Sequence, residues 1–116
     1  MATSTPSKSL GTRLVNKVAI ITGGGSGFGE SISKRFSEEG CKVIVADLDP
    51  VGGQRVAAYN DQNMYFIQMN VAKDGDWERV VRETKERFGR VDILVNNAGT
   101  SYRNKVCGKL ATIYEV

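Results

Sequence analysis

The chain has 116 residues, of which 41% are hydrophobic and 25% charged, and its formal net charge is +3 at pH 7. This length allows one domain at most, and no apolar run is long enough for a membrane-spanning helix. The small positive charge is spread along the chain, so composition indicates neither a nucleic-acid partner nor a membrane partner.

The two cysteines, Cys41 and Cys107, lie far apart, and the chain contains no histidine. This pattern indicates neither a disulfide framework nor a zinc site, so we expect no metal and a reduced, cytoplasmic protein. Residues 1–13 are rich in Ser and Thr and lack the apolar segment of a secretory signal. We interpret them as a disordered N-terminal lead.

The first predicted strand is Val18–Thr22, a short apolar run that is typical of a strand covered on both faces of a parallel sheet. Glycines follow it. Beyond them Phe28, Ile32 and Phe36 recur at the spacing of one helical face. Gly40 then provides a left-handed end to this first helix.

The second predicted strand is Lys42–Asp47, which is apolar and ends on an acid. Asp49 is placed to cap a second helix that begins at Pro50. Two adjacent glycines, at positions 52 and 53, weaken the start of that helix. Met64–Met69 is the third predicted strand.

A third helix begins near Asp74 and Asp76, whose negative charges suit a helix N-terminus, and it ends at Gly89. Its apolar face is predicted to consist of Trp77, Val80, Val81, Thr84 and Phe88. Val91–Val95 is the fourth strand. The alternation predicts an α/β fold, a partial Rossmann fold with a doubly wound parallel sheet of about four strands in the order 3-2-1-4.

The glycine-rich turn Thr22–Gly29 lies between the first strand and the first helix, where a phosphate site is physically expected. A helix N-terminus offers unpaired N–H groups and a partial positive charge to a pyrophosphate, and glycines allow close approach. Asp47 follows Gly29 by 18 positions, near the roughly 20 expected of the acid that binds the adenosine ribose. The fold is therefore expected to bind a nucleotide.

Two other glycine motifs do not match. A Walker loop requires Lys and Ser/Thr after its last glycine, but the chain has Glu30 and Ser31, and this excludes an NTPase. The GxGxxG pattern fails because Phe28 occupies the position of its third glycine. A GxGxG loop over residues 23–27 leaves an S-adenosylmethionine-dependent methyltransferase as an alternative, although no acid precedes its glycines.

The pattern TGxxxGxG does match, from Thr22 to Gly29, and Asn96-Asn97-Ala98-Gly99 follows the fourth strand. With both motifs at strand ends, residues 14–104 resemble the N-terminal, cofactor-binding part of the short-chain dehydrogenase/reductase family. Residues 105–116 form an atypical tail. The resemblance implies a carbonyl/alcohol oxidoreductase with a nicotinamide dinucleotide cofactor, NAD or NADP.

The resemblance also implies roles for individual residues. Those expected to wrap the pyrophosphate are Gly23, Ser26, Gly27, Phe28 and Gly29. Those expected to bind the adenosine end are Asp47 at the ribose, Leu48 beside it, and Asn70 and Val71 at the adenine. Those expected to line the rest of the dinucleotide path are Asn97, Ala98 and Gly99, whereas Asn96 is expected to brace the sheet.

Charge predicts that NAD is preferred over NADP. A 2′-phosphate would face the carboxylate of Asp47, with Asp49 close by, and would be repelled. Relatives that prefer NADP tend to carry a basic residue just before the middle glycine, where this chain has the neutral Ser26.

No catalytic residue is assigned in this chain. The family uses a Tyr-xxx-Lys pair, but the chain contains no such match, and Tyr102 and Lys105 are only three positions apart. We therefore expect the chain to be inactive alone and its substrate to be indeterminate. A non-catalytic nucleotide-binding partner of a full-length relative remains a second alternative.

The fourth strand, residues 91–95, is expected to be an exposed apolar edge. Such edges pair readily with other chains. The sequence therefore predicts self-association or aggregation through this strand.

Overall fold

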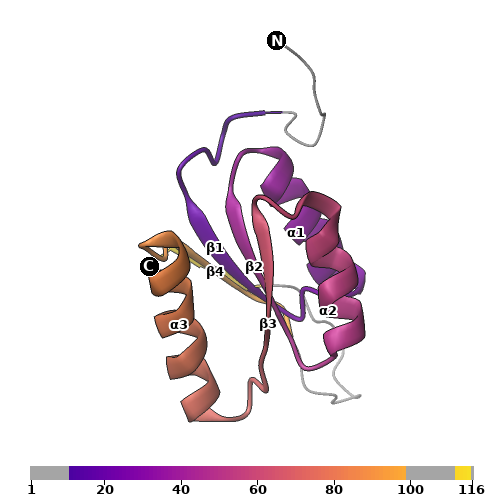
Figure 1. Cartoon of the computed structure of the whole chain (residues 1–116), viewed down its shortest axis with the longest axis vertical. Helices are drawn as coiled ribbons and strands as arrows, with labels where there is room; N and C mark the ends of the chain where they lie inside the picture. The colour runs from indigo at the N-terminus through magenta and orange to yellow at the C-terminus, as the bar shows by residue number, and fades with distance from the viewer. Residues whose placement is uncertain (1–10, 99–111, 116) are drawn as a thin grey trace.

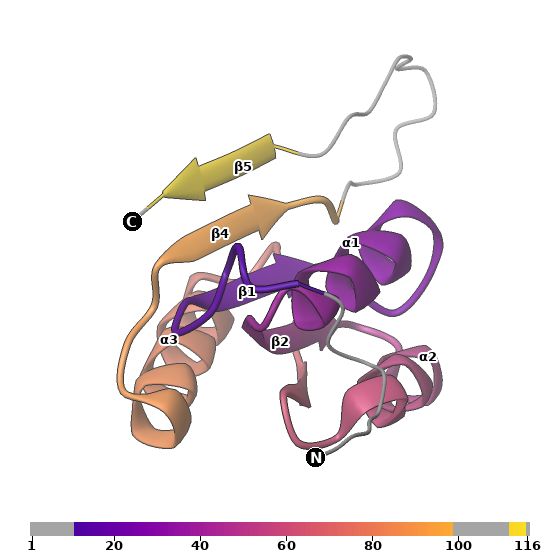
Figure 2. The same cartoon turned by 90° about the horizontal axis from the view of Figure 1, so that it is seen from above.

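The computed structural model describes residues 11–98 and 112–115. Within them one sheet has the strand order β3-β2-β1-β4-β5 (Figures 1 and 2). The strands are β1 Val18–Thr22, β2 Lys42–Asp47, β3 Met64–Gln68, β4 Ile93–Asn96 and β5 Thr112–Glu115. The first four are parallel, which confirms the predicted order 3-2-1-4, and β5 runs antiparallel to β4.

The helices are α1 Gly27–Glu38, α2 Pro50–Ala57 and α3 Asp74–Phe88, with a 3₁₀ turn at Ala58–Asn60 after α2. Figure 1 shows α1 and α2 on one side of the sheet and α3 on the other, which is the doubly wound arrangement predicted. In the part of the chain that the structure describes, no helix combines the length and hydropathy needed to cross a membrane.

The predicted helix ends are confirmed. The side chain of Asp49 accepts a hydrogen bond from the Val51 N–H (3.0 Å), and Pro50 occupies the first turn of α2. Gly40 and Gly89 have φ of 91° and 87°, the left-handed conformation that ends a helix at low cost.

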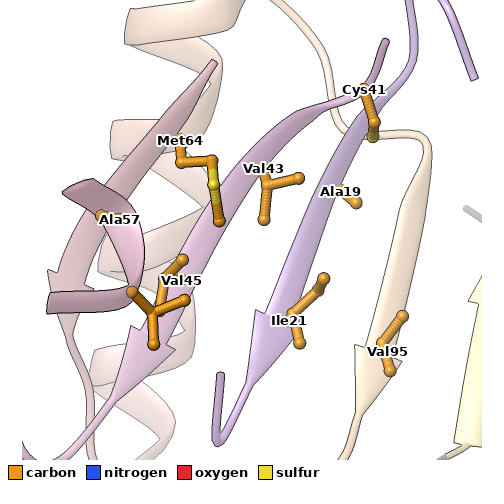
Figure 3. Close-up of a cluster of buried hydrophobic side chains, with 9 residues drawn as sticks. Ala19, Ile21, Cys41, Val43, Val45, Ala57, Met64 and Val95 are labelled. Carbon is orange, nitrogen blue, oxygen red and sulfur yellow. The ribbon is translucent and has the colours of Figure 1, made fainter. Parts of the chain in front are cut away.

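Alternate residues of the central strands enter two separate apolar layers. Ala19 and Ile21 of β1 pack toward α1 and α2, together with Val43 and Val45 of β2 (Figure 3). The intervening Ile20 packs in the layer beneath α3. That second layer consists of Ile20, Ile44, Ala46, Ile67, Met69 and Val80. Because both faces are covered, the strands carry continuous apolar runs rather than alternating ones.

Of the expected N-terminal lead, residues 1–10 lie outside the described residues, but Gly11 and Arg13 are bonded to the end of α1. The Gly11 N–H donates to the Glu38 carbonyl (2.9 Å). The backbone N–H and the guanidinium of Arg13 both donate to the carboxylate of Glu39 (3.1 and 3.2 Å). Residues just before position 14 thus contact α1, and the predicted domain boundary at residue 14 stays a prediction.

The expectation that residues 91–95 form an exposed edge is wrong. β5, which lies within the tail 105–116, pairs with β4 from Ile93–Glu115 to Asn96–Thr112, on the side opposite β1 (Figure 2). Its sequence TIYE contains β-branched and aromatic residues, which favour a strand. β4 is therefore paired on both sides, and the predicted self-association of the chain stays a prediction that light scattering would test.

The two glycines in α2 have a packing reason that the sequence does not reveal. A Cβ added at Gly53 would overlap the aromatic ring of Phe66 on β3, and one added at Gly52 would lie 2.9 Å from the Gly25 carbonyl oxygen. A larger residue at either position would push α2 away from β3 or from the glycine-rich turn. The unfavourable helix propensity is the cost of this close approach.

We predict that Gly53→Ala lowers the free energy of unfolding by about 1–3 kcal/mol, because overpacking against Phe66 outweighs the gain in helix propensity. Gly75→Ala in α3 is the matched control, since an added Cβ there meets nothing within 4 Å. It should raise stability by up to about 1 kcal/mol. Urea unfolding followed by circular dichroism measures both, and a stabilised Gly53→Ala variant would contradict the packing argument.

Candidate cofactor site

A cavity of about 450 Å³ lies at the carboxyl ends of β1 to β4. Ligands of open α/β sheets bind at this edge. Its lining includes these predicted residues: Gly23, Ser26, Asp47, Leu48, Asn70, Val71, Asn97 and Ala98. Three unpredicted residues, Ala46, Met69 and Ala72, also line it. Each of them is adjacent in sequence to a predicted one, and that adjacency was the only signal for them.

The remaining predicted residues do not line this cavity. Gly27, Phe28 and Gly29 form the first turn of α1, and the side chain of Phe28 is exposed. Gly99 lies outside the described residues. The prediction that the backbone of α1's first turn wraps a pyrophosphate concerns N–H groups rather than side chains, and it stays a prediction.

The glycine-rich turn has the shape that a phosphate cradle requires. Gly23 has a φ of 66°, and an added Cβ would lie 2.9 Å from the Ala98 Cα. A Cβ on Gly29 would overlap the Gly23 carbonyl oxygen. At Gly27, by contrast, the φ is 57° and an added Cβ would meet nothing within 4 Å. The turn is therefore packed on its inner side and open at Gly27.

The N-terminus of α1 fits an anionic group. The N-cap residue Ser26 makes no side-chain hydrogen bond to the first turn. The first-turn N–H groups of a helix carry partial positive charge and need an acceptor. An open, uncapped N-terminus at the edge of the cavity therefore suits the pyrophosphate of a dinucleotide.

Both carboxylate oxygens of Asp47 are held by backbone N–H groups. Oδ2 accepts from the Gly25 N–H (2.8 Å) and Oδ1 accepts from the Asp49 N–H (2.9 Å). These bonds fix the carboxylate at the end of β2, in the cavity wall. They also tie the glycine-rich turn to the β2–α2 loop, a second function for Asp47 that the sequence did not suggest.

The first turn of α3 holds the loop at the end of β3. Oδ2 of Asp76 accepts from the Asn70 N–H (2.8 Å), and the indole N–H of Trp77 donates to the Val71 carbonyl (2.9 Å). The hydrogen bond from Asn70, helped by the nearby Arg79, lowers the pKa of Asp76. The Asn70–Val71 segment is thus fixed against α3 rather than free, and the side-chain oxygen of Asn70 accepts from the Ala72 N–H (2.9 Å).

The buried hydroxyl of Thr22 connects the glycine-rich turn with the segment after β4. Its oxygen accepts hydrogen bonds from the N–H groups of Asn97 and Ala98, both at 3.0 Å. The side-chain oxygen of Asn96 lies 3.4 Å from the same hydroxyl, which is consistent with a bracing role. The side-chain N–H of Asn97 in turn donates to the Gly23 carbonyl (3.3 Å).

Among the described residues that line this cavity, Asp47 is the only one with an ionisable side chain. Tyr102 and Lys105 lie outside the described residues. Burial raises the pKa of the Cys41 thiol to about 12, so this thiol remains protonated and unreactive at neutral pH. The described part of the site is built to bind and orient a ligand.

We predict that Thr22→Val lowers the free energy of unfolding by about 1–3 kcal/mol, because the N–H groups of Asn97 and Ala98 lose their shared acceptor. Thr22→Ser keeps the hydroxyl and serves as the matched control. Chemical unfolding measures stability, and equilibrium dialysis measures the loss of dinucleotide binding expected in the Val variant. Equal behaviour of the two variants would show that the hydroxyl is not needed.

Comparisons with known proteins identify the family and the fold. A model of the family described as short chain dehydrogenase matches residues 17–112. The 3-beta-hydroxysteroid dehydrogenase of Comamonas testosteroni is 39% identical over 87 residues, which cover 75% of this chain and 34% of that protein. Secoisolariciresinol dehydrogenase of Forsythia intermedia is 39% identical over 105 residues, covering 90% and 38%.

Among solved structures, a 3-ketoacyl-(acyl-carrier-protein) reductase from Brucella melitensis complexed with NADH is similar, with a TM-score of 0.72 and 45% sequence identity. The similarity covers 74% of this chain and 36% of that chain. The chain thus spans about a third of the length of the relatives it matches.

These matches do not favour the methyltransferase and non-catalytic alternatives, and they agree with the TGxxxGxG and NNAG motifs at the carboxyl edge of the sheet. The chain belongs to the short-chain dehydrogenase/reductase family and corresponds to its N-terminal, nicotinamide-dinucleotide-binding region.

Proposed function

We propose that this chain binds NAD in preference to NADP, as the cofactor-binding region of an enzyme that interconverts a carbonyl and an alcohol. The observation that carries the preference is the position of Asp47. Its carboxylate is in the cavity wall at the end of β2, and two backbone N–H groups hold it in place. A carboxylate at this point of the fold accepts hydrogen bonds from the ribose hydroxyls of NAD.

The charge around the cavity supports the same preference. None of the described residues that line the cavity is basic, and the next acid along the chain, Asp49, donates its backbone N–H to the Asp47 carboxylate. A 2′-phosphate would therefore bring negative charge toward the Asp47 carboxylate without a compensating cation in the described lining. Coulombic repulsion over a few ångströms is sufficient to discriminate between the two cofactors.

The geometry described above supports the following binding roles. The backbone of the turn from Gly23 to Gly29 would hold the pyrophosphate, Asp47 the ribose, and the Asn70–Val71 segment the adenine. Asn97 and Ala98 would border the path toward the nicotinamide. The bound nicotinamide supplies hydride transfer. The chain's own residues bind and orient it, and because the sequence has no Tyr-xxx-Lys pair, we infer that the 116-residue chain binds the cofactor without turnover.

The test is calorimetric titration of the chain with NAD, NADP and S-adenosylmethionine. The wild type should bind NAD more tightly than NADP and should not bind the methyl donor. Asp47→Asn keeps an oxygen that accepts from the Gly25 N–H but removes the negative charge. In this variant the ratio of NAD affinity to NADP affinity should fall by about tenfold, which corresponds to a free-energy difference on the order of 1.4 kcal/mol.

Asp61→Asn is the matched control, because Asp61 is an exposed carboxylate beyond the 3₁₀ turn and does not line the cavity. It removes the same charge and should leave the ratio of the two affinities unchanged. Tighter binding of NADP than of NAD by the wild type would refute the proposed preference.

A further inference from the structure

Arg55 on α2 contacts the glycine-rich turn at Gly25, the same residue that Asp47 holds. Its guanidinium donates to the Gly25 carbonyl (3.1 Å), while the Gly25 N–H donates to Asp47 (2.8 Å). One residue of the turn is thus held by a cation at its carbonyl and by an anion at its N–H. Arg55 does not line the cavity, yet Gly25 bonds both its guanidinium and the carboxylate expected at the ribose.

The orientation of Arg55 is set by Glu30 in the first turn of α1. Both terminal nitrogens of the guanidinium bond the Glu30 carboxylate, at 3.1 and 3.2 Å. Lys34, one turn further along α1, donates to the same carboxylate (2.8 Å). Hydrogen bonds from Arg55 and Lys34 lower the pKa of Glu30 to about 2, so this carboxylate is charged throughout the neutral range.

The stability gained from this cluster is small. The side chain of Arg55 is 56% exposed, and ion pairs at such exposure contribute little to stability. The main consequence of the ion pair is geometric, because two hydrogen bonds to Glu30 fix the plane and direction of the Arg55 guanidinium. Arginine is also the side chain best suited to bind a phosphate through two nitrogens.

We propose that Glu30 holds Arg55 against the back of the glycine-rich turn and so withholds its guanidinium from a 2′-phosphate, which makes Glu30 a determinant of cofactor specificity beside Asp47. This inference rests on the proposed function, since it concerns the same ribose end of the same cofactor. Arg55 in this arrangement supports the carbonyl of Gly25. With Glu30 neutralised, the long and exposed arginine side chain turns toward added negative charge at the ribose.

The test is the ratio of NADP affinity to NAD affinity in Glu30→Gln, measured by calorimetry on the whole chain. We expect the ratio to rise about three- to tenfold, because one guanidinium is released toward the phosphate. The affinity for NAD should change less than about twofold, since NAD has no group that needs a cation there. A ratio equal to that of the wild type would overturn the inference.

Two double variants identify the responsible cation. Glu30→Gln with Arg55→Gln should lose the gain in NADP affinity, whereas Glu30→Gln with Lys34→Gln should keep it. The reverse result would assign the effect to Lys34 and overturn the role of Arg55. Glu83→Gln is the control for charge alone, because Glu83 pairs with Arg79 on α3, away from the cavity.

Folding of each variant is checked by circular dichroism and by its unfolding midpoint. Glu30→Ala provides a second neutral variant with high helix propensity, so the inference stays testable if the glutamine variant is poorly folded. If the folded wild type binds neither dinucleotide, the proposed function fails. If it binds NAD and neither neutral variant changes the ratio relative to Glu83→Gln, only the inference about Glu30 fails.

Discussion

The arrangement of the site depends on one buried hydroxyl group. Thr22 ends β1, and its oxygen accepts from two consecutive N–H groups beyond β4, which brings Ala98 against Gly23. At this contact a single added carbon would not fit, so Gly23 and the hydroxyl are required together. The bond from the Asn97 side chain to the Gly23 carbonyl closes the same junction. Without these bonds, the pairing of Thr22 with Asn96 would still place the two segments side by side but would not fix Ala98 against Gly23.

Carboxylates shape the rest of the cavity by accepting from backbone N–H groups. Asp47 fixes Gly25, and Asp76 fixes Asn70. Hydrogen bonds to charged acceptors are stronger than neutral ones, and loops without regular structure need partners for their N–H groups. The acids at the carboxyl edge thus order the loops as well as setting the local charge. Replacing such an acid by its amide keeps an oxygen that accepts the hydrogen bond but removes the charge, so the substitution separates loop ordering from electrostatics.

The sequence predicted the structural features that are determined by residues close together along the chain. The apolar runs of β1 and β2, the Asp49 cap and the glycine ends of α1 and α3 are all local signals, and the structure has them where expected. The sequence did not predict the features that depend on contacts between residues far apart along the chain. Gly53 appeared only to weaken α2, because the ring of Phe66 that excludes a Cβ comes from a different strand. The pairing of β5 with β4 also joins distant segments, so the short TIYE run gave no indication of its partner.

The bond between Trp77 and the Val71 carbonyl has a practical consequence. Trp77 is the only tryptophan of the chain, and Val71 lines the cavity at the position expected for the adenine. The ultraviolet emission of the protein therefore originates next to one end of the cavity. Its intensity and wavelength respond to the polarity and hydrogen bonding of that indole. The chain carries its own optical reporter, without a dye or a label, for any ligand that displaces or stiffens the loop after β3.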